Sequence, residues 1–276
     1  MKEAKLHFIG TPLGNRLDIT LRALEVLKSL QYFFAEDSRE FYKLLDLYEI
    51  SHDGKHVQSY GNHNMKEATE KAMGWLNLGH DVGFVSDRGM PGISDPGALL
   101  AQRARTEGYG ILPVPGPAAV TTLLAICGFS GDRFYFLGFL PLGPKDRGLV
   151  FASARSAGVT CCFYESPKRI RETLDDLKRE FPNGEVFLGR EMTKIYETYS
   201  FFSLADLDSS QAIEKGEYTV VLNPGAAPVA PDAWREEVRG RLAHDKEWAK
   251  SVGLRFGMPA SEIYNALQEM KRTKES

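Results

Sequence analysis

The segment 84–97 joins a short apolar stretch to a second apolar stretch through a turn rich in glycine, proline and aspartate. We predict a strand over residues 81–85, which places the carboxylate of Asp87 at the end of a strand, where open α/β sheets bind their ligands. Asp95 and Pro96 are typical residues for the start of the helix that follows. Glycines in the turn let the main chain approach a bound molecule closely. The segment therefore predicts an α/β sheet with a ligand at this turn, although an ordinary glycine-rich connection fits the same residues.

Two other turns of this kind occur in the first half of the chain. Residues 10–15 follow a predicted strand over 6–9, and residues 115–119 follow a predicted strand over 111–114. We expect Asp18 to cap the helix after the first of these turns. That turn has neither the Gly-x-Gly-x-x-Gly pattern of dinucleotide-binding folds nor the Gly-Lys-Ser/Thr ending of a phosphate-binding loop. A sheet that repeats such turns at its carboxyl edge builds a ligand cleft there.

Charged residues gather after three further predicted strands, at residues 36–39, 164–169 and 189–194. In the first group Ser38 can cap the next helix, and the acidic residues beside it favour the positive end of that helix. Taken singly, each group is compatible with a solvated rim of ion pairs. The two later groups occupy matching positions in the second half of the chain, which favours a functional site.

The length of 276 residues favours two domains. We predict an N-terminal α/β domain over residues 1–130 that contains the glycine and proline turns. A packed connection over residues 131–144 leads to a C-terminal α/β domain over 145–224. Residues 225–276 are predicted to form a linker and a helical tail, whose last helix covers 262–271.

Net charge, cysteine content and hydropathy limit the molecules that the protein can bind and the compartment in which it is found. The formal net charge of −3 gives no overall basic field, so any contact with RNA must be local. Cys127, Cys161 and Cys162 lack a metal-ligand spacing, and we interpret them as core thiols in a reducing compartment, with no metal site. The amino terminus lacks a signal-peptide core, and no apolar run approaches the length of a membrane span. We expect a cytoplasmic protein without a membrane segment.

Several segments match, in order, the signatures of a known family. They are Gly10-Thr-Pro-Leu-Gly-Asn15, Glu36-Asp-Ser-Arg39, Ser86-Asp-Arg-Gly-Met-Pro-Gly-Ile-Ser-Asp-Pro-Gly97, Pro115-Gly-Pro-Ala118, Phe139-Leu-Pro141, Phe163-Tyr-Glu-Ser-Pro-Lys-Arg169 and Arg190-Glu-Met-Thr-Lys194. The chain thereby resembles the bacterial 16S rRNA (cytidine-2′-O)-methyltransferases of the tetrapyrrole methylase superfamily, class III of the S-adenosylmethionine-dependent methyltransferases. It departs from the usual family pattern at Arg88, Ser38 and Met192, where alanine, threonine and leucine are common.

The resemblance implies a two-domain tetrapyrrole-methylase-like fold, in which each domain is a sheet flanked by helices and a short helical appendix follows. It also implies a homodimer and a cleft between the domains that binds S-adenosylmethionine. Carried over position by position, the residues expected to line the cofactor are Pro12, Asp87, Met90, Ala119, Val120, Tyr164, Met192 and Tyr218.

The implied reaction is methylation of a cytidine ribose 2′-hydroxyl in the decoding region of 16S rRNA. A hydroxyl is a weak nucleophile at neutral pH, so a nearby base helps, while most of the rate can come from positioning. Candidate bases are Glu36, Asp37 and Glu191, and Arg39 and Lys194 are candidate catalytic cations. The residues expected to contact RNA are Arg88, Lys168, Arg169 and Arg190. Because the chain is acidic, we expect its substrate to be a structured particle, the small ribosomal subunit, which offers more surface than a short oligonucleotide.

Two alternatives remain open from the sequence. One is a methyltransferase of the same superfamily that acts on a corrin or porphyrin precursor. The charged strand ends and the motif match argue against it. The other is a non-catalytic RNA-binding protein whose helical tail, ending in residues 271–274, does the binding. Thermal stabilisation by S-adenosylmethionine would exclude this second alternative.

Overall fold

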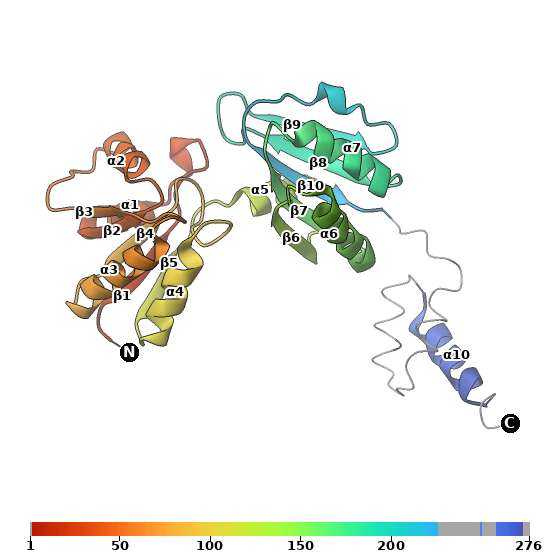
Figure 1. Cartoon of the computed structure of the whole chain (residues 1–276), viewed down its shortest axis with the longest axis horizontal. Coiled ribbons are helices and arrows are strands. Elements are labelled where there is room, and N and C mark those ends of the chain that lie inside the picture. Colours follow the sequence, from red (N-terminus) through yellow and green to blue (C-terminus); the bar gives the residue numbers. More distant parts are fainter. Residues whose placement is uncertain (1, 226–248, 250–257, 273–276) are drawn as a thin grey trace.

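The computed structural model describes residues 2–225, 249 and 258–272. It contains two α/β domains, each with a five-stranded sheet, as Figure 1 shows. The predicted fold class is confirmed. The last described element is helix α10 (Ala260–Arg272), which agrees with the helix expected near the end of the chain. The rest of the linker and helical tail expected over residues 225–276 lies largely outside the described residues.

The first sheet is entirely parallel and has the strand order β3-β2-β4-β1-β5. Its strands are β1 (Lys5–Ile9), β2 (Tyr32–Ala35), β3 (His56–Ser59), β4 (Val82–Val85) and β5 (Gly110–Val114). Its helices are α1 (Leu21–Ser29), α2 (Ser38–Leu47), α3 (Met65–Asn77) and α4 (Gly97–Thr106). Strand side chains pack against α1 and α2 in one core cluster and against α3 and α4 in another, so apolar residues are buried on both faces.

Strands β1 and β4 are neighbours, but the helices that follow them, α1 and α4, cover opposite faces of the sheet. A crevice therefore opens at the carboxyl ends of β1 and β4, the position at which open α/β sheets bind ligands. The turn after each strand enters this crevice. The two turns pair directly, because Thr11 and Gly89 form a short antiparallel bridge. The strand order thus brings together two of the turns that the sequence indicated.

The helix caps differ from the expected ones in two places. Thr20 caps α1, because its hydroxyl oxygen accepts the Ala23 N–H at 3.1 Å. Asp18 instead ends a short 3-10 turn, η1 (Arg16–Asp18), so the predicted cap is wrong. Asp37 caps α2 by accepting the Arg39 N–H at 2.8 Å, and Ser38 becomes the first helical residue.

The second sheet has the order β6-β7-β10-β8-β9 and is mostly antiparallel, with β6 and β7 parallel. Its strands are β6 (Phe134–Phe139), β7 (Thr160–Glu165), β8 (Glu185–Arg190), β9 (Thr198–Ser203) and β10 (Tyr218–Asn223). Helices α6 (Pro144–Ala157) and α7 (Ile170–Glu180) cover one face. Strand β6 falls within the segment 131–144, so part of the expected connection is a strand of the second sheet.

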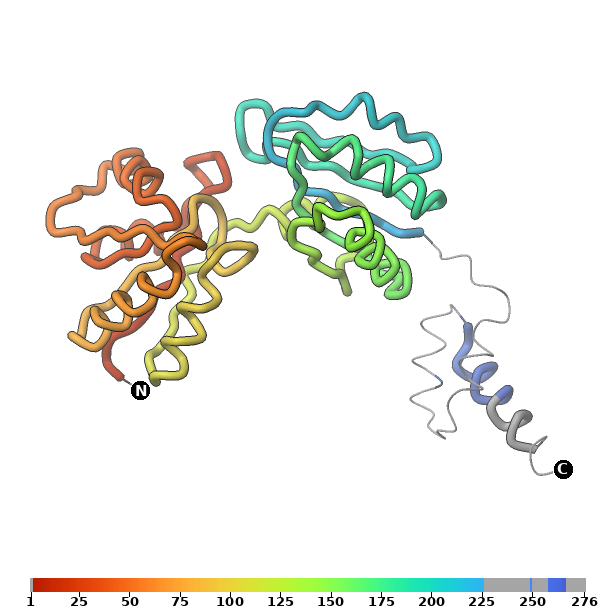
Figure 2. Tube along the Cα trace, in the orientation of Figure 1, coloured from red at the N-terminus to blue at the C-terminus, as the bar shows by residue number. Residues whose placement is uncertain are grey.

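The chain crosses from the first sheet to the second after β5, through residues 115–118 into α5 (Ala119–Ile126), as Figure 2 traces. Val120 and Leu123 of α5 pack with Cys162 and Val221 on the second sheet, on the face opposite α6 and α7. Helix α5 therefore belongs to the core of the second domain, although the sequence places it in the first. The three cysteines are buried and free, as expected for core thiols. No helix in the described part of the chain has the length and apolarity of a membrane span.

Candidate active site

A cleft of about 710 Å³ lies between the two domains. The first domain lines it with the residues that follow β2 and β4, and the interdomain crossing contributes the start of α5. The second domain lines it with the ends of β6 and β7 and the start of β10. The predicted residues that line it are Glu36, Asp37, Asp87, Arg88, Met90, Ala119, Tyr164 and Tyr218. Strand ends in both domains, which the sequence analysis predicted as functional, thus line the same cleft.

The first-domain wall of the cleft is a linked set of carboxylates. Because β2 and β4 are parallel neighbours, their carboxyl ends lie side by side. The Asp37 N–H donates to Asp87 Oδ1 at 2.9 Å, and the Asp87 N–H donates to Glu36 Oε2 at 3.3 Å. Asp95 also lines the cleft, and its two oxygens accept the N–H groups of Gly92 and Gly97. Acidic groups therefore dominate this wall.

The two sequence neighbours among these carboxylates have opposite pKa shifts. Burial raises the pKa of Glu36, and the nearby charge of Asp87 adds to the increase. The hydrogen bond from the Arg39 side chain lowers the pKa of Asp37 to about 2. Arg39 Nη2 lies 2.6 Å from Asp37 Oδ2, so this pair neutralises itself. A general base works best when its pKa approaches the working pH, which favours Glu36 over Asp37.

Tight backbone packing fixes the turns below the cleft. Gly89 has a φ of 79°, and a Cβ at this position would lie 3.1 Å from Leu13 Cδ2 and 3.3 Å from the Pro117 carbonyl oxygen. Gly89 is therefore packed closely against both the turn after β1 and the turn after β5. Gly10 and Gly116 approach even more closely, because a Cβ on Gly10 would lie 2.5 Å from Gly116 Cα. Larger side chains at these crossings would push the three turns apart.

The second-domain wall of the cleft is largely aromatic. The rings of Phe139 and Tyr164 lie 5.5 Å apart, and burial raises the pKa of the Tyr164 phenol. The nearby Val120 N–H opposes this increase in part. The Tyr218 hydroxyl donates to the Ile213 carbonyl oxygen at 2.8 Å. The Tyr218 phenol is thus held in place, and the rings of these residues give the cleft an apolar surface.

Three residues expected to line the cofactor do not line the cleft. Pro12, Val120 and Met192 are buried, and they are not among the residues that line the cleft. Met192 packs with Val120 in the core cluster between α5 and the second sheet. A Cβ on Gly189 would lie 2.6 Å from the Met192 sulfur, so this glycine makes room for it.

A second polar cluster joins the two domains at the edge of the cleft, which two of its members, Arg88 and Glu217, also line. Arg88 Nη1 lies 2.9 Å from Glu217 Oε1 and 3.1 Å from Oε2. Lys194 Nζ lies 2.8 Å from Glu217 Oε2 and 2.9 Å from Glu191 Oε1. Burial raises the pKa of Glu191, but the Lys194 hydrogen bond and the Glu217 N–H outweigh this effect, so the net pKa is below its usual value. Of the predicted catalytic residues, Glu36 and Asp37 line the cleft, whereas Glu191 and Lys194 are not among its lining residues.

The other cations expected to bind RNA differ in their availability. Lys168 is exposed. Arg169 is only 17% exposed, and its guanidinium pairs with the fully buried Glu165 at 2.6 Å. Arg190 donates to the carbonyl oxygens of Lys215 and Tyr196 at 2.7 and 3.3 Å. Arg169 is thus committed to the fold, whereas the Lys168 ammonium is open to a partner.

Sequence reasoning missed Glu217, which lines the cleft and contacts Arg88. Strand β10 runs antiparallel to both β7 and β8, so its first residue, Tyr218, pairs with Glu165 and Arg190 at their last residues. The beginning of β10 therefore lies beside the ends of its neighbours. A search for charged residues only at the carboxyl ends of strands overlooks a residue at the beginning of a strand. The sequence feature that could have identified Glu217 is the Gly216-Glu217 pair just before an apolar strand.

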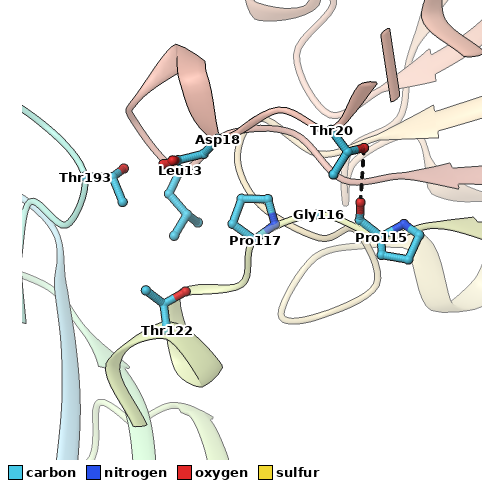
Figure 3. Close-up of a pocket in the computed structure, with 8 residues that line it drawn as sticks. All are labelled: Leu13, Asp18, Thr20, Pro115, Gly116, Pro117, Thr122 and Thr193. Atoms are coloured by element: carbon cyan, nitrogen blue, oxygen red, sulfur yellow. Dashed lines mark hydrogen bonds between the residues drawn. The ribbon is translucent and has the colours of Figure 1, made fainter. Parts of the chain in front are cut away.

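A smaller groove of about 440 Å³ lies next to the cleft, and Leu13 lines both. Figure 3 shows its walls, which come from the turn after β1, the interdomain crossing and the second domain. They are lined by Leu13, Asp18, Thr20, Pro115, Gly116, Pro117, Thr122 and Thr193. The Thr20 hydroxyl donates to the Pro115 carbonyl oxygen at 3.5 Å across one end of the groove. Within the described residues, no group of three or more His, Cys, Asp or Glu side chains is arranged to hold a metal ion.

Residues 5–208 match the family model of tetrapyrrole (corrin/porphyrin) methylases. The chain belongs to the tetrapyrrole methylase family. Its relatives include the protein named ribosomal RNA small subunit methyltransferase I of Halalkalibacterium halodurans, which is 34% identical over 94% of this chain and 93% of its own length. The protein of the same name from Thermotoga maritima is 39% identical over 79% of this chain and 98% of its own length. This tetrapyrrole methylase thus matches those relatives across nearly their whole length.

Solved structures share the fold at low sequence identity. Diphthine synthase has a TM-score of 0.60 and 15% identity, and it covers 79% of this chain and 90% of its own. The methyltransferase CobJ has a TM-score of 0.61 and 18% identity, with 79% and 93% coverage. These matches extend over both domains of this tetrapyrrole methylase.

Proposed function

We propose that this chain transfers the methyl group of S-adenosylmethionine to the 2′-hydroxyl of a cytidine ribose in the decoding region of 16S rRNA. The observation that carries this proposal is the interdomain cleft, which combines a carboxylate of raised pKa with an aromatic wall. The end-to-end match with relatives named ribosomal RNA small subunit methyltransferase I supports rRNA as the substrate.

The residues of the cleft fit the cofactor in size and charge. Small-molecule sites usually measure about 300–1,000 Å³, and this cleft measures about 710 Å³. S-adenosylmethionine carries a sulfonium and an ammonium, and carboxylates such as Asp87 stabilise cations of this kind. When bound, the cofactor supplies a methyl group that is already activated by the sulfonium. The rings of Tyr164 and Phe139 give the adenine or the methionine chain an apolar surface.

The reaction requires the protein to hold the acceptor hydroxyl and to remove its proton. Glu36 is the residue best suited to accept that proton, because it lines the cleft and its pKa is raised. Arg39 and Asp37 neutralise each other at the start of α2, which leaves Asp37 a weaker base. Glu36 is positioned to take this proton because it lines the same cleft as the aromatic wall.

The substrate and assembly follow from the same proposal. RNA carries phosphates, which the acidic wall repels, so only the acceptor ribose enters the cleft and the rest of the RNA binds at its rim. We propose Arg88, Lys168 and Arg190 as rim contacts and the small ribosomal subunit as the natural substrate. A homodimer enlarges the surface available to that particle. Because ribosomal subunits are made in the cytoplasm, the protein is proposed to act there.

The two alternative functions have weaker support. Corrin and porphyrin methylation is suggested only by the family description, while relatives at 31–39% identity are named for ribosomal RNA. A non-catalytic RNA-binding protein has no use for a cleft that combines a half-buried carboxylate of raised pKa with an aromatic wall.

The decisive test is nucleoside mass spectrometry of 16S rRNA from a strain with and without the gene. We expect 2′-O-methylcytidine from the decoding region to disappear in the deletion strain and to return with the wild-type gene. Complementation with Glu36→Gln is expected to leave the nucleoside absent. An unchanged nucleoside profile in the deletion strain would contradict the proposed function.

A further inference from the structure

Arg88 and Lys194 reach the same carboxylate from different domains. Arg88 belongs to the turn after β4, and Lys194 follows β8, yet both contact Glu217 within 3.1 Å. The Lys194 stem packs against the first domain as well, because a Cβ on Gly14 would lie 2.3 Å from Lys194 Cγ. Two cations held 3 Å from one carboxylate form an anion site that spans both domains.

We propose that this anion site binds a phosphodiester of the substrate RNA and that Glu217 occupies it until the RNA arrives. The inference rests on the proposed function and adds a specific phosphate contact to it. A phosphodiester carries one negative charge, as the carboxylate does, so the exchange preserves the charge balance with Arg88, Lys194 and Glu191. Arginine and lysine are also the side chains that most often bind nucleic-acid phosphates.

The Glu217 carboxylate can move away from Arg88 and Lys194 at little cost in stability. Its side chain is 67% exposed and that of Arg88 is 47% exposed, and exposed ion pairs contribute little to stability. Glu217 follows Gly216, whose φ of 89° marks a loop before β10. Glu191 is the fixed partner instead, because it is only 17% exposed and accepts both the Lys194 ammonium and the Glu217 N–H. Lys194 therefore keeps its position when the Glu217 carboxylate turns away.

The site also lies where a phosphate next to the acceptor ribose would be expected. Arg88 and Glu217 line the large cleft with Glu36, while Thr193, beside Lys194, lines the smaller groove. The Thr193 hydroxyl accepts the Asn15 N–H at 3.2 Å, which ties this segment to the first domain. A strand whose phosphate is held between the two cavities can place its ribose in the large one.

The test compares Glu217→Gln with wild type in filter binding of naked 16S rRNA over a series of salt concentrations. We expect the variant to bind RNA about two- to fivefold more tightly, the scale of an exposed ion pair. Arg88→Ala is expected to weaken binding and to reduce the slope of log K against log salt by about 0.7–0.9, the value of one lost phosphate contact. In the Arg88→Ala background, the gain from Glu217→Gln is expected to shrink.

Glu214→Gln is the matched control. Glu214 lies in the same loop and forms an exposed ion pair with Arg171 at 3.4 Å, so its replacement changes the net charge equally. We expect no change in RNA affinity. The inference is wrong if Glu217→Gln binds RNA with wild-type affinity. It is also wrong if the variant binds S-adenosylmethionine more weakly in calorimetry without binding RNA more tightly. In either case Glu217 serves only to hold the two domains together. Methyl transfer by the wild-type protein tests the proposed function separately.

Discussion

At the scale of single residues, the protein separates chemical and structural roles among side chains that look alike in the sequence. Glu36 and Asp37 are adjacent, yet burial raises the pKa of one and Arg39 lowers the pKa of the other. Lys168 and Arg169 are also adjacent, yet one is exposed and the other pairs with a buried carboxylate. Function at this scale depends on which neighbour lies within hydrogen-bonding distance.

Replacing Glu36 by Gln is expected to lower kcat by roughly 10²–10⁴-fold, the usual contribution of a general base. A base must be deprotonated to act, so wild-type kcat rises with pH as Glu36 loses its proton. Because the pKa of Glu36 is raised, this rise occurs at higher pH than for an ordinary glutamate. Single-turnover rates against pH are the measurement. Glu67→Gln, an exposed residue of α3 paired with Lys71, is the control and keeps the wild-type profile. A profile of the same shape in Glu36→Gln would exclude this residue as the base.

Replacing Arg169 by Ala is expected to destabilise the second domain by about 3–5 kcal/mol, because it leaves the buried Glu165 without its cation. Thr173 still donates to Glu165 at 2.7 Å, but a hydroxyl does not balance the charge. Lys168→Ala is the matched control, and an exposed change of this kind alters stability by about 0.5 kcal/mol or less. Urea denaturation of both variants gives the comparison. Equal midpoints would show that Arg169 is free for RNA, as the sequence suggested.

At the scale of elements, the site is made by turns that cross one another. The turns after β1, β4 and β5 contact each other through Gly10, Gly89 and Gly116, and α5 continues from the last of them into the second domain. The end of β5 thus connects the first sheet, the cleft and the second core. A disturbance at this crossing is expected to affect all three.

Replacing Gly10 by Ala is expected to cost about 1–3 kcal/mol, because its Cβ meets the backbone of Gly116 and not a side chain that can move. The control is Gly148→Ala in the interior of α6, where a Cβ meets nothing within 4 Å. That change is expected to stabilise the protein by about 0.5–1 kcal/mol, since it removes the entropy cost of a helical glycine. Thermal unfolding distinguishes the two. If both variants are equally stable, the two turns are not in tight contact.

At the scale of the whole molecule, the acidic net charge disfavours RNA binding, and only local cations favour it. The net charge of −3 and the acidic cleft wall disfavour an arbitrary polyanion, yet cations from both domains lie around the cleft. Affinity for RNA must then come from a few phosphate contacts together with the shape of the substrate. A large structured particle satisfies this requirement better than a short strand does.

We therefore expect methyl transfer at physiological salt to be most efficient with the assembled small subunit, weaker with naked 16S rRNA and weakest with a short decoding-region hairpin. The measurement is kcat/KM with radiolabelled cofactor for the three substrates. A dimer in light scattering is expected under the same conditions. If the hairpin reacts as efficiently as the particle, recognition does not need an extended surface.

The amino-acid sequence by itself determined the elements and the chemistry of the first sheet. Strands, helices and glycine turns follow from the short-range spacing of apolar residues, glycine and proline, and the parallel sheet brings Asp87, Glu36 and Met90 to one edge. The family resemblance supplied the cofactor and the two-domain fold. These properties are local or repeated, so they can be predicted without coordinates.

Only the tertiary structure decided the rest. Antiparallel pairing of β10 carries Glu217 to Arg88, a residue distant in sequence. The second core buries Met192 and makes Arg169 a partner of Glu165. It also incorporates α5 and β6, which the sequence assigned to the first domain and the connection. Burial and pairing between distant segments depend on how the two sheets form and pack, and the spacing of residues along the chain carries no record of them.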